Sequence, residues 1–272
     1  MNILSAAVCI LATAVAVTST PVEVVTRSGR LGIHRGKDAT KGNHPYQVAL
    51  FADNQFFCSG AIISMNSILT TANCVDWARG DIEVRAGVYK LDDTDKDIQT
   101  MTATPADRII HPNFDLEYLD NDIAIINNLN LQRVENVVEW AKLPTYADAG
   151  INLTTVVATV TGWGSVNDDD KLSNVMQVAE ITLADTSACV PEYGTGIIGT
   201  KLCATTELAS TCTGDAGGPA IITVRREYRL LALVSHGSQG GCTQGKPVVF
   251  TRVSAFLEFI QDNAQAVSIS DN

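Results

Sequence analysis

The chain has 272 residues, of which 46% are hydrophobic and 18% charged, and its net charge is −11. This composition supports one large buried core or two modest ones, and it excludes a disordered or fibrous protein. The acidic balance argues against nucleic acid as a partner, because a phosphate backbone requires a basic face. We interpret the acidic clusters at 92–97 and 168–170 as solvated loops rather than metal sites, since they lack a fixed spacing of oxygen ligands.

The first twenty residues carry no charge and contain an apolar run, 3–17, which has the length of a signal-peptide core. This run is too short for a comfortable membrane span, and no second apolar stretch supports the alternative of an uncleaved anchor. We therefore predict a signal peptide over 1–19, a short pro-segment or extension over 20–32, and one domain over 33–272. The mature protein is expected to be secreted and extracellular.

Loss of the signal peptide removes Cys9 and leaves six cysteines, an even number that indicates three disulfides in a secreted chain. Six cysteines allow fifteen pairings, and their spacing does not choose among them. The chain contains one glycosylation sequon, Asn-Leu-Thr, and we predict a glycan at its first residue, Asn152.

From about residue 45 onward, short runs of β-branched and aromatic residues alternate with polar turns, which is typical of an all-β protein. These runs lie at 46–51, 61–72, 122–129, 154–163, 176–184 and 247–253. Because exposed sheet edges invite aggregation, we expect the sheets to close into barrels or a sandwich.

Two further patterns stand near the end of the chain. Residues 220–235 place apolar runs on either side of Arg225, Arg226 and Glu227, which predicts a hairpin with a polar tip. Apolar residues then recur at helical spacing between Val253 and Ala264, so we predict a terminal helix that is capped by Ser254.

Seven motifs occur in a fixed order along the chain, and together they resemble the trypsin-like serine proteases of the chymotrypsin fold. The motifs are GKDATKGNHPYQV (36–48), ILTTANCV (68–75), DNDIAII (120–126), TGWG (161–164), CTGDAGGPA (212–220), LVSHG (233–237) and GKPVVFTRV (245–253). The resemblance implies two six-stranded antiparallel β-barrels, a cleft between them and a C-terminal α-helix. It also implies the disulfide pairs Cys58 with Cys74, Cys189 with Cys203, and Cys212 with Cys242.

The chemistry of this family requires a serine nucleophile, a histidine base and a buried aspartate that orients the histidine. By the resemblance, the aspartate is Asp122, the histidine position holds Asn73, and the serine position holds Ala216. A carboxamide is no general base near neutral pH, and a methyl group has no nucleophilic atom. We therefore expect a degenerate serine protease that is not an enzyme.

The pocket for a substrate side chain also departs from the family pattern. Its floor position holds Ser210, which removes the anionic group that selects arginine or lysine. Val248 replaces a wall glycine and predicts either a shallow, elastase-like pocket or complete occlusion. His236 replaces a wall tryptophan, and it is either a surface histidine or a pH-sensitive contact.

The activation site and the calcium loop of the family are both altered in this chain. The family's new N-terminus corresponds to Ile33, which Gly32 precedes instead of arginine or lysine, so the usual cleavage lacks its site. The ends of the family's calcium loop are apolar in this chain. We therefore expect neither a bound metal nor another cofactor.

The residues together suggest a secreted, non-catalytic serine protease homologue that binds another protein. It is similar to arthropod homologues that serve immune protease cascades, and more so to inactivated gut-trypsin paralogues of parasitic mites that interfere with host complement. Host complement or other protease-cascade components are the expected partners, the chain is expected to be a monomer, and no membrane is involved. The alternatives are a filler or storage protein without a specific partner, a residual serine endopeptidase, and a decoy that captures protease inhibitors.

Overall fold

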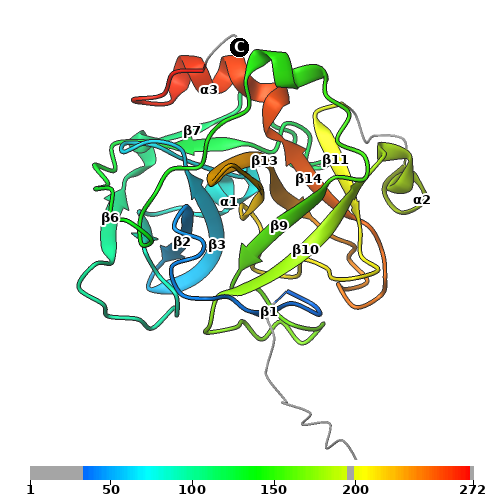
Figure 1. The fold of residues 1–272 in the computed structure, drawn as a ribbon, viewed down its shortest axis with the longest axis horizontal. Coiled ribbons are helices and arrows are strands. Elements are labelled where there is room, and N and C mark those ends of the chain that lie inside the picture. Colours follow the sequence, from blue (N-terminus) through cyan, green and yellow to red (C-terminus); the bar gives the residue numbers. More distant parts are fainter. Residues whose placement is uncertain (1–32, 195–198, 270–272) are drawn as a thin grey trace, which may run out of the picture.

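A computed structural model describes residues 33–194 and 199–269. The predicted signal peptide and the segment 20–32 lie outside these residues. Within the described ranges, no helix is both long enough and apolar enough to cross a membrane. Figure 1 shows two sheets side by side, with the strands of the first half of the chain on the left and most strands of the second half on the right.

The N-terminal sheet is antiparallel and follows the order β6-β5-β2-β3-β4-β8-β7. Its strands are β2 (Gln47–Ala52), β3 (Gln55–Ile62), β4 (Ile68–Thr70), β5 (Ile82–Ala86), β6 (Gln99–Ala103), β7 (Arg108–Ile110) and β8 (Ala124–Ile126). The backbones of β6 and β7 do not pair, so this sheet is a half-barrel. Instead, the guanidinium of Arg108 donates to the carbonyl oxygens of Ala78 and Ala103, at 2.9 and 3.5 Å.

The C-terminal sheet closes on itself, because β9 pairs with both β12 and β10. Its strands are β9 (Val157–Gly162), β10 (Gln177–Ala184), β11 (Lys201–Thr205), β12 (Pro219–Val224), β13 (Glu227–His236) and β14 (Val248–Arg252), with β1 (Lys37–Asp38) paired along β10. The alternating burial of β10 matches the alternation of apolar and polar residues in its sequence. This ring is a closed six-stranded barrel.

The predicted all-β fold is confirmed, with a closed barrel in the second half and a half-barrel in the first. The three disulfides that the family resemblance implied are all present. The predicted hairpin is also present, although Glu227 belongs to β13 and only Arg225 and Arg226 form the turn.

The helices are short. They are α1 (Ala72–Trp77), α2 (Val190–Tyr193) and α3 (Leu257–Asn263), with 3-10 turns at Pro105–Asp107, Tyr146–Gly150, Thr186–Ala188 and Val253–Phe256. The predicted terminal helix is confirmed, but its cap was wrong. A 3-10 turn begins the segment, so α3 starts one turn later than expected, and the hydroxyl of Ser254 accepts a hydrogen bond from Arg252 Nε at 2.9 Å.

The core contains one large apolar cluster inside each sheet, a third between them and two smaller clusters. This third cluster combines Ile123 and Ile125 of the first half with Ile221 and Leu233 of the second. Ile260 of α3 packs against the same cluster. The interface between the two sheets is therefore a continuous part of the core, and it holds the residues of the cleft in fixed positions.

Candidate active-site cleft

Asp122 lies at the centre of the interface between the sheets and is 1% exposed. Its Oδ1 accepts a hydrogen bond from the backbone N–H of Asn73 at 2.8 Å, and its Oδ2 accepts one from Ser235 Oγ at 2.6 Å. The hydroxyl of Thr251 donates to its backbone carbonyl at 2.7 Å. Burial raises the pKa of Asp122 to about 6, although the hydrogen bonds from Ser235 and Asn73 oppose this shift.

Asn73 is the second residue of α1, and the Cys58–Cys74 disulfide joins this helix to β3. The contact between Asn73 and Asp122 uses the backbone of Asn73, while its half-buried side chain carries a carboxamide. The structure thus brings the predicted aspartate and the substituted histidine position together, but without an imidazole between them.

Ala216 lies at the apex of a loop whose glycines Gly214 and Gly217 have φ angles of +94° and +77°. Its carbonyl accepts the N–H of Ser59 at 2.8 Å, and the next N–H, from Gly217, donates to Val234 at 2.8 Å. The methyl group packs against the apolar cluster that contains Ala72 and Cys74, the two neighbours of Asn73. The loop therefore places Ala216, which has no reactive atom, against the same cluster as the two neighbours of Asn73.

Asp215 precedes Ala216 in this loop, and its side chain is fully buried. Its carboxyl oxygens accept N–H groups from Gly164 and Cys212, each at 2.9 Å. A Cβ atom on Gly162 or Gly164 would overlap this carboxyl group, which explains the glycines on both sides of Trp163. No ion pair reaches Asp215 from the described parts of the chain, and burial raises its pKa to about 7.

A cavity of about 570 Å³ opens beside Ala216. The predicted pocket residues Ser210, His236 and Val248 all line it, and Ser210 and Val248 are buried. Val248 forms part of the cavity wall. Ser210 contributes a neutral hydroxyl, which donates to the carbonyl of Thr211 at 3.1 Å.

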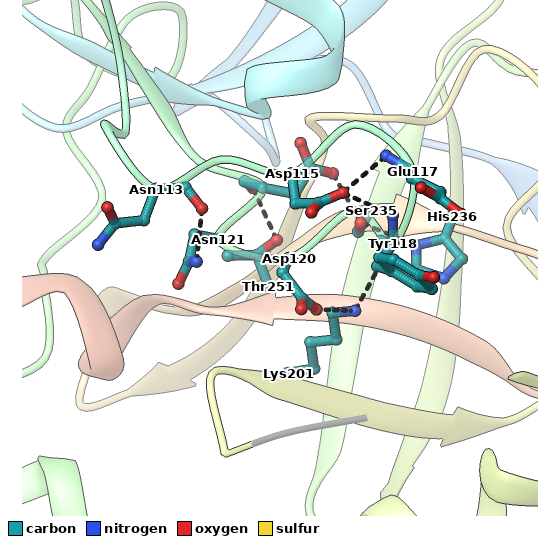
Figure 2. Close-up of polar contacts among 11 residues, drawn as sticks. Asn113, Asp115, Glu117, Tyr118, Asp120, Asn121, Lys201, Ser235, His236 and Thr251 are labelled. Carbon is teal, nitrogen blue, oxygen red and sulfur yellow. Dashed lines mark hydrogen bonds and ion pairs between the residues drawn. The ribbon is translucent and has the colours of Figure 1, made fainter. Parts of the chain in front are cut away.

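His236 is half-buried at the end of β13 rather than on the open surface. Its ring packs edge-on against Tyr193 with 5.2 Å between centroids, and its Nδ1 lies 3.0 Å from Ser235 Oγ (Figure 2). Burial, with a smaller contribution from Lys201, lowers the pKa of His236 to about 4. The imidazole is therefore neutral across the physiological range.

A buried ion pair that no sequence motif predicted lies beside this histidine. Lys201 begins β11, its side chain is only 5% exposed, and its Nζ lies 2.6 Å from Asp120 and 2.8 Å from the carbonyl of Tyr118 (Figure 2). A lysine at the start of the otherwise apolar run KLCA was the one available sign of this arrangement.

A second unpredicted feature is a hydrogen-bonded bridge across the cavity rim. Asp168, interpreted as part of a solvated loop, accepts the N–H groups of Cys242 and Thr243 at 2.7 and 3.2 Å, together with the Thr243 hydroxyl. A Cβ atom on Gly241 would overlap this carboxylate, and the φ of Gly241 is +105°. Two loops that line the cavity are therefore joined through one side chain.

The predicted glycosylation residue, Asn152, lies in an exposed loop. Its side-chain oxygen accepts the N–H of Thr154 at 2.8 Å. An exposed position is compatible with an attached glycan, and glycosylation itself stays a prediction.

Fold and cleft together define the class of protein: two packed β-sheets whose interface carries a buried aspartate, a glycine-bounded loop and a side-chain cavity. The sequence profile described as Trypsin matches residues 33–260. The chain belongs to the trypsin family.

The chain is similar to proteins of known name and to a solved structure. The chain is 32% identical to brachyurin of Leptuca pugilator, with 83% of this chain and 96% of the relative covered, and 30% identical to chymotrypsin of Phaedon cochleariae, with 86% and 83% covered. The solved structure of HL collagenase matches with a TM-score of 0.76 at 28% identity, covering 87% of this chain and all of that one.

Proposed function

We propose that this chain is a secreted, non-catalytic member of the trypsin family that acts by binding another protein. The observation that carries the proposal is the pair of substitutions in an otherwise well-formed cleft. Ala216 offers no nucleophile, and Asn73 offers no base. In a related protease of another fold, loss of the serine or the histidine alone lowers turnover by about a million-fold.

Neighbouring hydroxyl groups provide no evident replacement. Ser235 is buried, and its Oγ already donates to Asp122 at 2.6 Å, so it is not directed at a substrate in the cavity. Thr213 is exposed but lies three residues before the loop apex. A residual endopeptidase would need a nucleophile at the position that Ala216 occupies.

A fluorophosphonate probe tests this part of the proposal directly, because it labels activated serines without requiring a particular substrate. We expect no labelling of the folded protein and no hydrolysis of casein, with an active chymotrypsin labelled in parallel as the control. Covalent labelling that heat denaturation abolishes would show that the chain is a serine hydrolase.

The binding role is tested by capture with the folded mature domain, using the secretions of its source and host serum as the two fluids. We expect a saturable partner that heat-denatured protein does not retain. A complement-dependent haemolysis assay asks whether that partner belongs to the complement cascade. A blank in both fluids would favour the filler or storage function.

The open cavity supports a second candidate, the capture of protease inhibitors. An inhibitor loop would need space for one side chain beside Ala216, and the cavity of about 570 Å³ provides it. Titration with a panel of serine-protease inhibitor proteins tests this candidate. Competition between an inhibitor and the captured partner would place that partner in the cleft.

A further inference from the structure

A second cavity, of about 760 Å³, lies on the outer face of the β12–β13 hairpin. Aliphatic side chains form half of its lining: Ile151, Leu153, Val156, Ile222, Val224, Leu230 and Leu231. Ile151 is 47% exposed and Val224 is 40% exposed, so this apolar surface is open to water. It shares no lining residue with the cavity beside Ala216. We call it the hairpin groove.

The tip of the hairpin has an unusual composition. Val224 pairs with Glu227, so Arg225 and Arg226 form a two-residue turn, and their φ angles are +51° and +68°. A two-residue turn with positive φ at both positions strongly prefers Asn-Gly or similar pairs, because other side chains are strained there. Two arginines in this turn reduce the stability of the hairpin while placing two exposed cations at the edge of the groove.

The groove is a basic site on an acidic protein. Lys142, Arg225 and Arg229 line it, and Arg226 lies next to it in the turn. Glu227 pairs with Lys142 and Arg229, at 2.5 and 3.3 Å, whereas no ion pair involves Arg225 or Arg226 among the described residues. With Asp148 counted beside Glu227, four cations and two anions give this region a charge of +2, against −11 for the whole chain.

We propose that the hairpin groove binds a segment of a partner protein in which aliphatic side chains are flanked by aspartates or glutamates. The aliphatic residues would fill the groove, and the carboxylates would pair with Arg225 and Arg226. This assignment rests on the proposed protein-binding function and names its surface. A polypeptide fits better than a single fatty acid, because one segment can offer two carboxylates to Arg225 and Arg226, whereas a fatty acid carries only one.

The strained turn allows a test in which stability and binding change in opposite directions. Arg225→Asn with Arg226→Gly installs the preferred turn, so we expect a higher melting temperature together with weaker binding. The matched control is Lys90→Ala with Lys96→Ala, which also removes two positive charges, but from exposed positions outside the hairpin.

The probe is the fluorescein-labelled heptapeptide EDLVLDE, whose fluorescence anisotropy is measured against increasing protein concentration. We expect saturable binding that weakens at least about tenfold in the Asn-Gly variant, changes less than about twofold in the lysine control, and weakens with salt. A second peptide, EDSTSDE, keeps the charges and should lose most of the affinity. Because Asn152 lies between Ile151 and Leu153, the protein is measured as secreted and again after enzymatic removal of glycans.

Several results would overturn the proposal: no binding of EDLVLDE at about 1 mM after deglycosylation, equal affinity in the Asn-Gly variant, or equal affinity for EDSTSDE. Saturable binding of dodecanoate without binding of the peptide would assign the groove to a lipid. The proposed protein-binding function is tested independently of this groove, and it fails if no partner is captured. If a captured partner binds the wild type and the Asn-Gly variant equally, the proposed protein-binding function stands, but the hairpin groove is not the binding surface.

Discussion

Asp215 and Asp122 are buried carboxyl groups that form no ion pair within the described residues, although Lys201 is close enough to oppose part of the Asp122 shift. Burial penalises the charged form more than the hydrogen bonds favour it, so both pKa values rise above the ordinary value of an aspartate. Between that value and the raised one, the folded state holds a proton that the unfolded state has lost. The contribution of each group to stability is therefore largest in acid and declines as pH rises.

For Asp215 the decline should occur between about pH 4 and pH 7. We expect Asp215→Asn to remove much of the pH dependence of the free energy of unfolding in this window, since each pKa unit corresponds to about 1.4 kcal/mol. Urea denaturation at intervals of pH measures the slope, and the exposed substitution Asp262→Asn serves as the control. An unchanged slope in Asp215→Asn would show that this carboxyl stays ionised in the folded protein.

The two substituted catalytic positions define a second prediction at this scale. We expect Asn73→His with Ala216→Ser to hydrolyse arginine substrates at least about a thousand-fold more slowly than an active trypsin. Ser210 supplies no anion at the cavity floor, and among the described residues no ammonium group pairs with Asp215. Initial rates on a chromogenic arginine peptide measure this, with Asn73→His alone as the blank. Rapid hydrolysis would show that the cavity still supports the family's specificity.

At the scale of the strands, β11 and the loop before β8 are joined by the ion pair of Lys201 and Asp120. We expect Asp120→Ala to lower the free energy of unfolding by about 3 kcal/mol, because the buried ammonium loses its partner. Lys201→Met keeps the packing of the aliphatic stem and leaves only the partly exposed carboxylate unpaired, so its cost should be smaller. Urea denaturation of the two variants measures both losses of unfolding free energy. A larger loss in Lys201→Met than in Asp120→Ala would contradict the prediction.

The strands also show which local patterns were sufficient for prediction. Alternating and continuous apolar runs correctly located β2, β9, β10 and the hairpin around Arg225 and Arg226, because burial follows the pleat of a strand. The start of the terminal helix was wrong, since the helical spacing from Val253 does not distinguish a 3-10 turn from the first turn of an α-helix.

At the scale of the whole molecule, the fold could be predicted because seven motifs occur in family order. The positions of Asn73, Asp122, Ser210, His236 and Val248 in one cleft follow from the same order. The contacts made by Lys201 and Asp168 were not predictable, since each joins residues separated by more than seventy positions. The side chain of Arg108 spans the open edge between β6 and β7, and no strand pattern indicates this contact.

The acidic surface also predicts the assembly state. A net charge of −11 should keep copies of the chain apart at neutral pH, so we expect a monomer by sedimentation velocity at physiological ionic strength. Solubility should be lowest near pH 4.7, where the net charge approaches zero. A stable dimer at micromolar concentration and neutral pH would contradict this.

The bridge made by Asp168 has a kinetic consequence. Together with the Cys212–Cys242 disulfide, it fixes both sides of the cavity rim before any partner arrives. A partner that enters this cavity loses its own freedom but does not have to immobilise the receptor, which lowers the entropic cost of association. Differences in affinity among partners of the cleft should therefore arise in their dissociation rates, with association rates that vary little.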